Sequence, residues 1–286
     1  MALPMIRDRK APPAGSAKPT PTYRTQRRFD RAARLFGEAP LGRLMDARVL
    51  VVGVGGVGSF AAEALARSGV GTLVLIDFDR VCITNSNRQL HAMKGTIGKA
   101  KVEVMAERLR LVHPTAEIEA VTEFYSQAAS ERLLSGRVDF VVDAIDNITA
   151  KAHLLATCLA RGIPVVSSMG AAARLDPTAI EVADLAHTRV DPFARAVRKV
   201  LKQQHGVAAT GDAAIGISAV FSTERAREPI PPAYDEGTGF VCVCPGGKNG
   251  LHDCDRRARI DGSASFVTGA FGLAAASVVV RRFIEA

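Results

Sequence analysis

A glycine-rich motif, GVGGVG at residues 53–58, separates two stretches of different periodicity. The stretch before it, ARVLVV at residues 47–52, is a continuous apolar run typical of a strand buried on both faces of a parallel sheet. The stretch after it, residues 57–68, has the pattern of a helix. Glycines at such a turn allow a sharp change of direction and let phosphates approach the helix N-terminus. The candidate nucleotide-binding glycines are Gly53, Gly55, Gly56 and Gly58.

The alternation of apolar runs and helical patterns continues to about residue 170 and becomes less regular afterwards. It predicts an α/β fold, Rossmann-like, with a mostly parallel doubly wound sheet and a less regular C-terminal part. The predicted helices are 29–37, 57–68, 98–112, 147–161 and 191–205. The predicted strands are 47–52, 72–77, 117–122, 138–143, 163–168 and 216–222.

The domain organisation follows from changes in composition along the 286 residues. Residues 1–26 are rich in proline, alanine and basic residues, which predicts a disordered basic arm. Residues 27–286 form one domain, in which 222–262 is an irregular excursion rich in cysteine, proline and glycine. The apolar stretch 266–280 is shorter than the ~20 residues of a membrane-spanning helix, so we expect a buried core helix whose small residues allow close packing on the sheet.

Charge and cysteine content indicate the setting in which the chain works. The net charge of +8 suits an anionic partner such as nucleic acid or a nucleotide, although it also serves solubility. The five cysteines are an odd number, and no secretory segment is apparent. We therefore expect a reducing, cytoplasmic environment rather than a disulfide framework.

Polar residues follow the successive strands and indicate which nucleotide is bound. Asp77 ends the second strand, about 20 residues after the glycine motif, where a carboxylate binds ribose hydroxyls in nucleotide folds. Arg88 and Lys101 supply positive charge suited to a triphosphate, and Asp146 supplies an oxygen ligand for Mg²⁺. Because carboxyl ends of parallel strands meet at one edge, these groups and Asn85 are expected to converge. The set favours ATP chemistry over hydride transfer.

The ordered motifs GVGGVGS, LIDFD, NSNRQ, KAKVE and DAIDN resemble those of the ubiquitin-activating-enzyme-like adenylyltransferases. The resemblance covers about residues 27–170 and implies ATP and Mg²⁺ as cofactors. It implies that Asp77 and Asp79 lie at the ribose side of the nucleotide. It further implies that Asn85, Arg88 and Lys101 contact phosphates, and that Asp146 serves Mg²⁺ and the α-phosphate.

An N-terminal arginine on the triphosphate, often supplied by the partner subunit of a dimer, is also implied by this resemblance. Arg31 and Arg34 match that position, and Arg34 is favoured. The alternative for both is a solvated helix face.

A closer resemblance, over most of the chain, is to the bacterial tRNA threonylcarbamoyladenosine dehydratases. It is carried by RLFGEAPL, AAEALARSGVGTLVLID, NRQLHA, VVDAIDN, LDPTAIEVADLAHTRVDP and VFSTE. It implies an ATP-dependent cyclisation on tRNA through an acyl-adenylate, and it allows a bound Na⁺ or K⁺. We expect the chain to form a homodimer. Candidate tRNA contacts are Arg24, Arg27, Arg28, Arg195, Arg198, Lys199 and Lys202.

The cysteines leave three interpretations open. Related sulfur-carrier activators often hold zinc with two CxxC pairs, whereas this chain has Cys242, Cys244 and Cys254 with His252 nearby. These side chains make a zinc site, a flexible loop or a reactive thiol. Cys82 and Cys158 fall in predicted secondary structure and are expected to be packing residues.

Three rival functions remain at this point. The first is adenylation of the C-terminus of a small sulfur-carrier protein, against which the missing CxxC pairs count. The second is a partner role in a cysteine desulfurase sulfur relay, acting through thiols. The third is a dehydrogenase.

Overall fold

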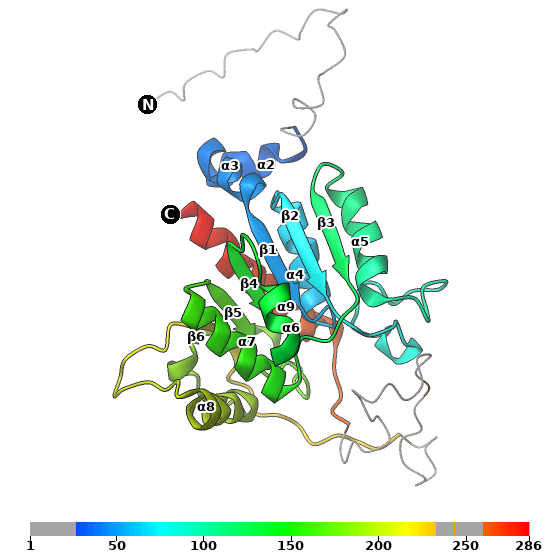
Figure 1. Ribbon diagram of the computed structural model, residues 1–286. Helices are drawn as coiled ribbons and strands as arrows, with labels where there is room; N and C mark the ends of the chain where they lie inside the picture. The colour runs from blue at the N-terminus through cyan, green and yellow to red at the C-terminus, as the bar shows by residue number, and fades with distance from the viewer. Residues whose placement is uncertain (1–26, 233–242, 244–259, 286) are drawn as a thin grey trace, which may run out of the picture.

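The computed structural model describes residues 27–232, 243 and 260–285. Seven strands form one sheet in the order β3-β2-β1-β4-β5-β7-β6 (Figure 1). Neighbours run parallel except β6, which pairs antiparallel with β7 at one edge. The expected mostly parallel, doubly wound α/β fold is confirmed. The strands are β1 (Arg48–Val52), β2 (Thr72–Ile76), β3 (Glu117–Val121), β4 (Phe140–Asp143), β5 (Val165–Ser168), β6 (Ile180–Asp184) and β7 (Ser218–Ser222).

Helices cover both faces of this sheet. One face packs against α3, α4, α5 and α9, and the other against α6, α7 and α8 (Figure 1). The α-helices are α2 (Asp30–Phe36), α3 (Glu38–Asp46), α4 (Gly58–Arg67), α5 (Lys101–Val112), α6 (Gln127–Leu133), α7 (Ile148–Arg161), α8 (Pro192–His205) and α9 (Ser265–Ile284). The short 3₁₀ helices are η1 (Ile83–Asn85), η2 (Pro177–Ala179) and η3 (Leu185–His187).

The two layers of the core follow from the alternation of side chains along each strand. In β1, Val49 and Val51 belong to the core cluster under α4, whereas Leu50 and Val52 belong to the cluster under α7. All four are at most 1% exposed. A strand that faces helices on both sides needs apolar residues at every position, which explains the unbroken apolar run.

The boundaries of α7 and α8 agree with the sequence, and a capping residue marks the start of each helix. Asn147 accepts a hydrogen bond from the backbone N of Ala150 and begins α7, and Gly162 ends that helix with φ 65°. Asp191 caps α8 in the same way, and Pro192 occupies the first turn. These helices begin and end within one residue of the predicted limits.

Three elements were not predicted because their sequences lack a clear periodic signal. Helix α3 contains Pro40 and Gly42, both of which are read as helix breakers, but Pro40 lies in the first turn where it is tolerated. Helix α6 has only 7 residues. Strand β6 is a half-buried edge strand. Each is stabilised by packing on neighbouring elements rather than by its own pattern.

Helix α5 begins at Lys101 instead of the predicted residue 98. Gly98 has φ 89°, and Ala100 forms an isolated antiparallel bridge with Arg80. Residues 98 and 99 form a turn and a bend, and the bridge holds Ala100 extended, so the helix starts only after it.

Helix α9 is packed inside the protein, as expected for a core helix. Among the described helices it alone is long and apolar enough to cross a membrane, and half of that apolar window is buried. Its glycines face α4 more closely than the sheet: a Cβ on Gly272 would lie 2.4 Å from the backbone O of Val57, and one on Gly269 would lie 3.1 Å from the Phe60 ring. Helix α9 also packs against β4, β5, β6 and β7, as expected, and these two glycines in addition permit close approach to a helix.

Candidate active site

The glycine motif forms a tight loop between β1 and α4. Gly53 has φ 88°, a conformation that favours glycine, and its backbone N donates to the O of Ile76 at 2.8 Å. A Cβ on Gly58 would lie 1.8 Å from the O of Gly53. Side chains at either position are therefore incompatible with this loop. The backbone N of Ser59 donates to the O of Gly55 at 3.1 Å, and that of Ala61 donates to the O of Val57 at 3.0 Å, so the first turn of α4 is built on the loop itself. The N-terminus of a helix that follows a glycine loop in this way is suited to a phosphate.

Two residues of the η1 region lie over the glycine loop. A Cβ on Gly56 would be 3.3 Å from Cγ of Arg88, and one on Gly55 would be 3.8 Å from Nε2 of Gln89. The Arg88 guanidinium donates to the O of Thr84 at 3.0 Å. A cationic side chain is thus held next to the loop.

Asp77 ends β2 and connects the glycine loop to the next turn. Its Oδ2 accepts from the backbone N of Val54 at 2.7 Å, and its Oδ1 accepts from the backbone N of Asp79 at 2.8 Å. The residue is 9% exposed, and burial raises the pKa of its carboxyl against the lowering effect of nearby Lys101. Each oxygen keeps one further lone pair for a ligand.

Lys101, the first residue of α5, lies among three carboxylates. Its Nζ is 2.7 Å from Oδ2 of Asp79. Burial alone would lower the pKa of Lys101, but Asp77, Asp79 and Asp146 together outweigh burial and raise it above its usual value. Lys101 is therefore a buried, charged ammonium. Asp146 lies exposed in the loop between β4 and α7.

Asn85 is mainly engaged with its own turn. It is 8% exposed, and its Oδ1 accepts from the backbone N of Cys82 at 3.0 Å. This bond closes the short η1 helix. Asn85 thus shapes the turn that carries Arg88 toward the glycine loop.

Arg31 and Arg34 are not brought together with these groups. Both lie in α2, beyond the end of the sheet where the strands begin (Figure 1). Phe29, just before α2, packs edge-on against His113 with ring centroids 4.7 Å apart, next to the start of β3. Arg34 pairs with Asp30 at 3.0 Å. The glycine loop is at the opposite edge, about 17 Å away along a five-residue strand.

Two of the candidate basic residues of the N-terminal region contact other groups of the same chain. Arg24 lies outside the described residues. Arg27 pairs with Asp30 at 3.3 Å, and Arg28 donates to the O of Val112 at 3.0 Å. Both are exposed.

The candidate basic residues of α8 divide into two groups. Arg195, Lys199 and Lys202 are exposed. Arg198 is half-buried and donates to the O of Leu185 at 3.1 Å and to the hydroxyl of Thr188. Arg198 thus ties α8 to η3, whereas the other three are available at the surface.

The structure describes two of the sites predicted for cysteines. The candidate zinc ligands Cys242, Cys244, Cys254 and His252 lie outside the described residues. Within the described ranges, no group of three or more His, Cys, Asp or Glu is arranged to hold a metal ion. Cys82 and Cys158 are buried, as expected for packing residues, and burial raises the pKa of the Cys158 thiol to about 12.

The sequence analysis did not predict a cluster of buried polar residues next to the Asp146 loop. Lys151 is fully buried, and its Nζ contacts Oδ2 of Asp143 at 2.5 Å and Oγ of Ser167 at 3.1 Å. Oδ1 of Asp143 accepts from the backbone N of Ile145 at 3.1 Å, so this cluster fixes the start of the loop. A lysine between two alanines on the apolar side of α7 is the signal that would have revealed it.

His91 was also missed, although it lies in a motif that carries the family resemblance. It is fully buried, and its Nε2 lies 3.0 Å from Oε1 of Gln89. Because a carbonyl oxygen only accepts, Nε2 carries the proton. Burial, and next the charge of Lys101, lower the pKa of His91 to about 3. A neutral imidazole therefore lies against Gln89, one of the residues over the glycine loop.

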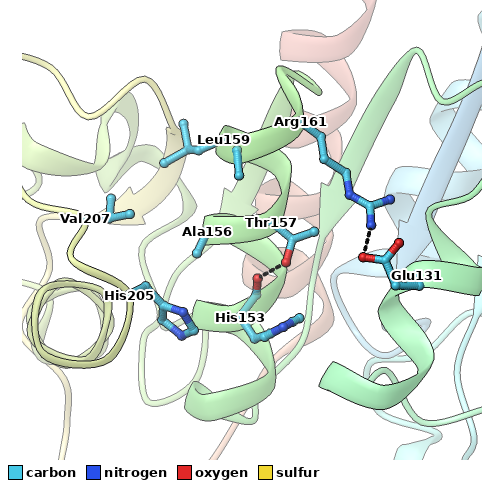
Figure 2. A pocket seen from close by; sticks show the side chains of 9 residues that line it. Glu131, His153, Ala156, Thr157, Leu159, Arg161, His205 and Val207 are labelled. Atoms are coloured by element: carbon cyan, nitrogen blue, oxygen red, sulfur yellow. Dashed lines mark hydrogen bonds and ion pairs between the residues drawn. The ribbon is translucent and has the colours of Figure 1, made fainter.

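A pocket of ≈ 610 Å³ lies away from this edge, against α7 and the end of α8. Figure 2 shows His153, His205, Thr157 and Arg161 among its lining side chains. None of the predicted site residues lines it. The candidate active site is therefore the carboxyl edge of the sheet, not this pocket.

Comparison with known proteins places this geometry in a family. The chain is 41% identical over 259 residues to the tRNA threonylcarbamoyladenosine dehydratase of Escherichia coli K12, covering 91% of this chain and 94% of that protein. It is 45% identical over 196 residues to the Bacillus subtilis protein of the same name, covering 68% of this chain and 74% of that one. A crystal structure of the E. coli enzyme, TcdA, in complex with ATP matches with TM-score 0.79 and 39% identity, over 93% of this chain and 96% of that one.

The ThiF family model matches residues 29–284, which include the whole sheet and every described site residue except those preceding α2. The glycine loop, the paired Lys101 and the acids around it all lie within the matched range. The chain belongs to the ThiF family.

Proposed function

We propose that this chain is an enzyme that dehydrates threonylcarbamoyladenosine in tRNA by an ATP-dependent cyclisation. The observation that carries the proposal is a glycine loop with Arg88 above it and the charged Lys101 beside it, at one edge of the sheet. Likeness to proteins named for this activity extends over nearly the whole chain. ATP is the expected nucleotide, since a related structure holds it.

The proposed reaction consists of two successive substitutions. The threonyl carboxylate attacks the α-phosphorus of ATP, forming an acyl-adenylate and releasing pyrophosphate. A nitrogen of the carbamoyl group then attacks the activated carbonyl, loses its proton and expels AMP; if the carbamoyl oxygen attacks instead, the proton leaves from the adjacent nitrogen. The net change in the nucleoside is loss of one water, because the carboxylate oxygen leaves with AMP. Adenylation converts a poor leaving group into a good one.

The charged residues have separate roles in this proposal. Arg88 and Lys101 neutralise charge on the phosphates, which is greatest where the pentavalent phosphorus forms. Asp77 and Asp79 bind the ribose side, and Asn85 shapes the turn beneath Arg88.

Asp146 is the proposed Mg²⁺ ligand. It is exposed at the strand edge and supplies the oxygen that Mg²⁺ prefers. The ion, when bound, would offset phosphate charge. The described residues offer no larger acidic cluster, which fits an ion held mainly by substrate phosphates and water.

The proposed assembly is a homodimer in which Arg34, or else Arg31, reaches the partner's nucleotide. Support comes from distance: within one chain these arginines are at the wrong edge of the sheet for their own glycine loop. Two further parts of the proposal rest on family resemblance alone. They are a bound Na⁺ or K⁺ ion and zinc at the cysteines outside the described residues. We place the enzyme in the cytoplasm.

The exposed basic face of α8, formed by Arg195, Lys199 and Lys202, is the proposed contact with tRNA phosphates. Such contacts supply affinity that falls steeply with salt. Contacts from the N-terminal arm belong to the same proposal.

The test is to incubate the protein with ATP, Mg²⁺ and tRNA that carries threonylcarbamoyladenosine, and to weigh the nucleosides after digestion. We expect an ATP-dependent loss of about 18 Da, the mass of one water. If the nucleoside stays unchanged, and pyrophosphate exchange requires a sulfur-carrier protein, the sulfur-carrier alternative replaces the proposal. Binding of a cysteine desulfurase without ATP turnover would favour the relay role.

A further inference from the structure

Arg174 is a buried arginine whose guanidinium is only partly hydrogen-bonded. It lies in the loop after β5 and is 4% exposed. Nη1 donates to the O of Ala172 at 2.8 Å. Nε and Nη2 are buried and have no hydrogen-bond partner in the part of the chain that the structure describes. A buried donor without an acceptor costs about 1–3 kcal/mol, so this arrangement requires an explanation.

The neighbouring carboxylate does not satisfy these donors. Nη2 lies 3.4 Å from Oδ2 of Asp191 without hydrogen-bond geometry. Asp191 already accepts from the backbone N of Gly170 at 3.1 Å and of Phe193 at 2.8 Å. Asp191 therefore holds the start of α8 against the loop and leaves one edge of the guanidinium unbonded.

The unbonded edge has a specific geometry. Nε–H and Nη2–H lie side by side on one edge of the planar guanidinium, and their two N–H bonds point in the same direction. This fork matches the two oxygens of a carboxylate. Bidentate binding uses one lone pair on each oxygen, which leaves the others for attack on phosphorus.

The backbone at both ends of this ion pair is strained. The non-glycine residues with positive φ in the described chain are Ala173, at 62°, and Val190, at 66°, and they directly precede Arg174 and Asp191. Such conformations cost about 1–3 kcal/mol each and persist where the surroundings demand them. The backbone of Ala173 is held on both sides, by the O of Gly262 and the N of Arg227, each at 2.8 Å.

The loop is adjacent to the nucleotide site. Strand β5 is the neighbour of β4, which carries Asp146 beyond its end, and β4 is the neighbour of β1, which leads to the glycine loop. Two strand spacings amount to about 10 Å. The segment before α9 spans the same edge: the O of Gly262 accepts from Ala173, and the O of Ser263 accepts from the Asn87 amide at 2.8 Å.

We propose that the Nε–Nη2 edge of Arg174 binds the substrate carboxylate and orients it toward the α-phosphate. The inference rests on the proposed function and deepens it by naming the residue that recognises the acid. Because Arg174 is 4% exposed in the ligand-free chain, binding at this edge requires the loop around it to open.

The test compares the nucleoside N⁶-threonylcarbamoyladenosine with its carboxamide, which has the same shape but no charge. Binding is measured by calorimetry with a non-hydrolysable ATP analogue present. We expect the wild-type protein to prefer the acid by about 10- to 100-fold, as for a charged hydrogen-bonded pair. Arg174→Gln should lose this preference and keep its affinity for the ATP analogue, and Arg174→Lys should recover part of it.

Arg48→Gln is the matched control, because Arg48 pairs with Glu119 at the other edge of the sheet and should not change the preference. If thermal melting shows that the Arg174→Gln protein is folded, and this protein still prefers the acid, the inference is overturned while the proposed function stands. A wild-type protein that neither binds the nucleoside nor converts the modified tRNA overturns the proposed function as well. If Arg174→Gln does not fold, the Arg174→Lys protein takes its place in the binding measurement. A preference for the acid equal to that of the wild type then overturns the inference.

Discussion

The ammonium nitrogen of Lys101 lies 2.7 Å from Oδ2 of Asp79, and the side chain of Lys101 is 7% exposed while that of Asp79 is 30% exposed. The pair therefore places a permanent positive charge at the edge of the sheet with its partner carboxylate open to solvent. A nucleotide phosphate that enters this site competes with Asp79 for the ammonium. The ligand-free chain keeps the charge balanced until that exchange occurs.

Replacing Lys101 should abolish nucleotide chemistry. Lys101→Ala is expected to slow pyrophosphate release by about 10²–10³-fold, the usual cost of removing one electrostatic donor from a transition state. Lys99, two residues earlier, is exposed and serves as the matched control. Equal rates for Lys101→Ala and Lys99→Ala would refute the assigned role of Lys101.

Two glycine-to-alanine changes should have opposite effects. Gly58→Ala places a Cβ 1.8 Å from the O of Gly53, so we expect a loss of stability of about 1–3 kcal/mol and weaker nucleotide binding. Gly42→Ala, inside α3, meets nothing within 4 Å and should stabilise the helix by about 0.5–1 kcal/mol. Urea unfolding of both variants measures this. A stable Gly58→Ala protein with unchanged nucleotide affinity would contradict the loop geometry.

His91 should make stability depend on pH. Its folded pKa of about 3 lies below the usual value of 6.5, so between these values the unfolded chain takes up a proton that the folded chain does not. Stability contributed by neutral His91 is complete above pH 6.5 and is lost as pH falls toward 3, by about 1.4 kcal/mol per pH unit. The His91→Gln variant should therefore lose about 2 kcal/mol less than wild type between pH 6.5 and 5.

The measurement for His91 is the free energy of unfolding in urea at both pH values. His187→Gln, at an exposed position, is the control and should follow the wild-type profile. Parallel profiles for wild type and His91→Gln would show that His91 is protonated or solvated in the folded state.

Subunit mixing should reveal where the N-terminal arginine acts. Arg34→Ala and Lys101→Ala should each be inactive as homodimers. If Arg34 acts on the partner's nucleotide, a mixed dimer contains one intact site, made of Lys101 from one subunit and Arg34 from the other, and activity returns. Inactive mixed dimers, verified by tandem affinity tags, would mean that the arginine acts within its own chain or not at all.

The sequence alone was sufficient for the layered α/β fold and for most elements that position the site. Continuous apolar runs such as residues 47–52 indicate strands covered on both faces, and capping residues such as Asn147 and Asp191 mark helix starts. Both signals are local, so they can be read without knowing what packs against them. Lys101 and Asp146 were placed at one edge by the same reasoning, since parallel strands bring their carboxyl ends together.

Tertiary structure decided which polar groups meet, because those contacts join residues distant in sequence. Arg174 and Asp191 are joined only when the loop after β5 meets the start of α8, and Lys151 contacts Asp143 and Ser167 only inside the folded core. The same packing engages Arg198 with Leu185 and turns the glycines of α9 toward α4. A residue's type and spacing specify the chemistry it is capable of, but burial and the partners supplied by other segments determine whether that chemistry is used for structure or for a ligand.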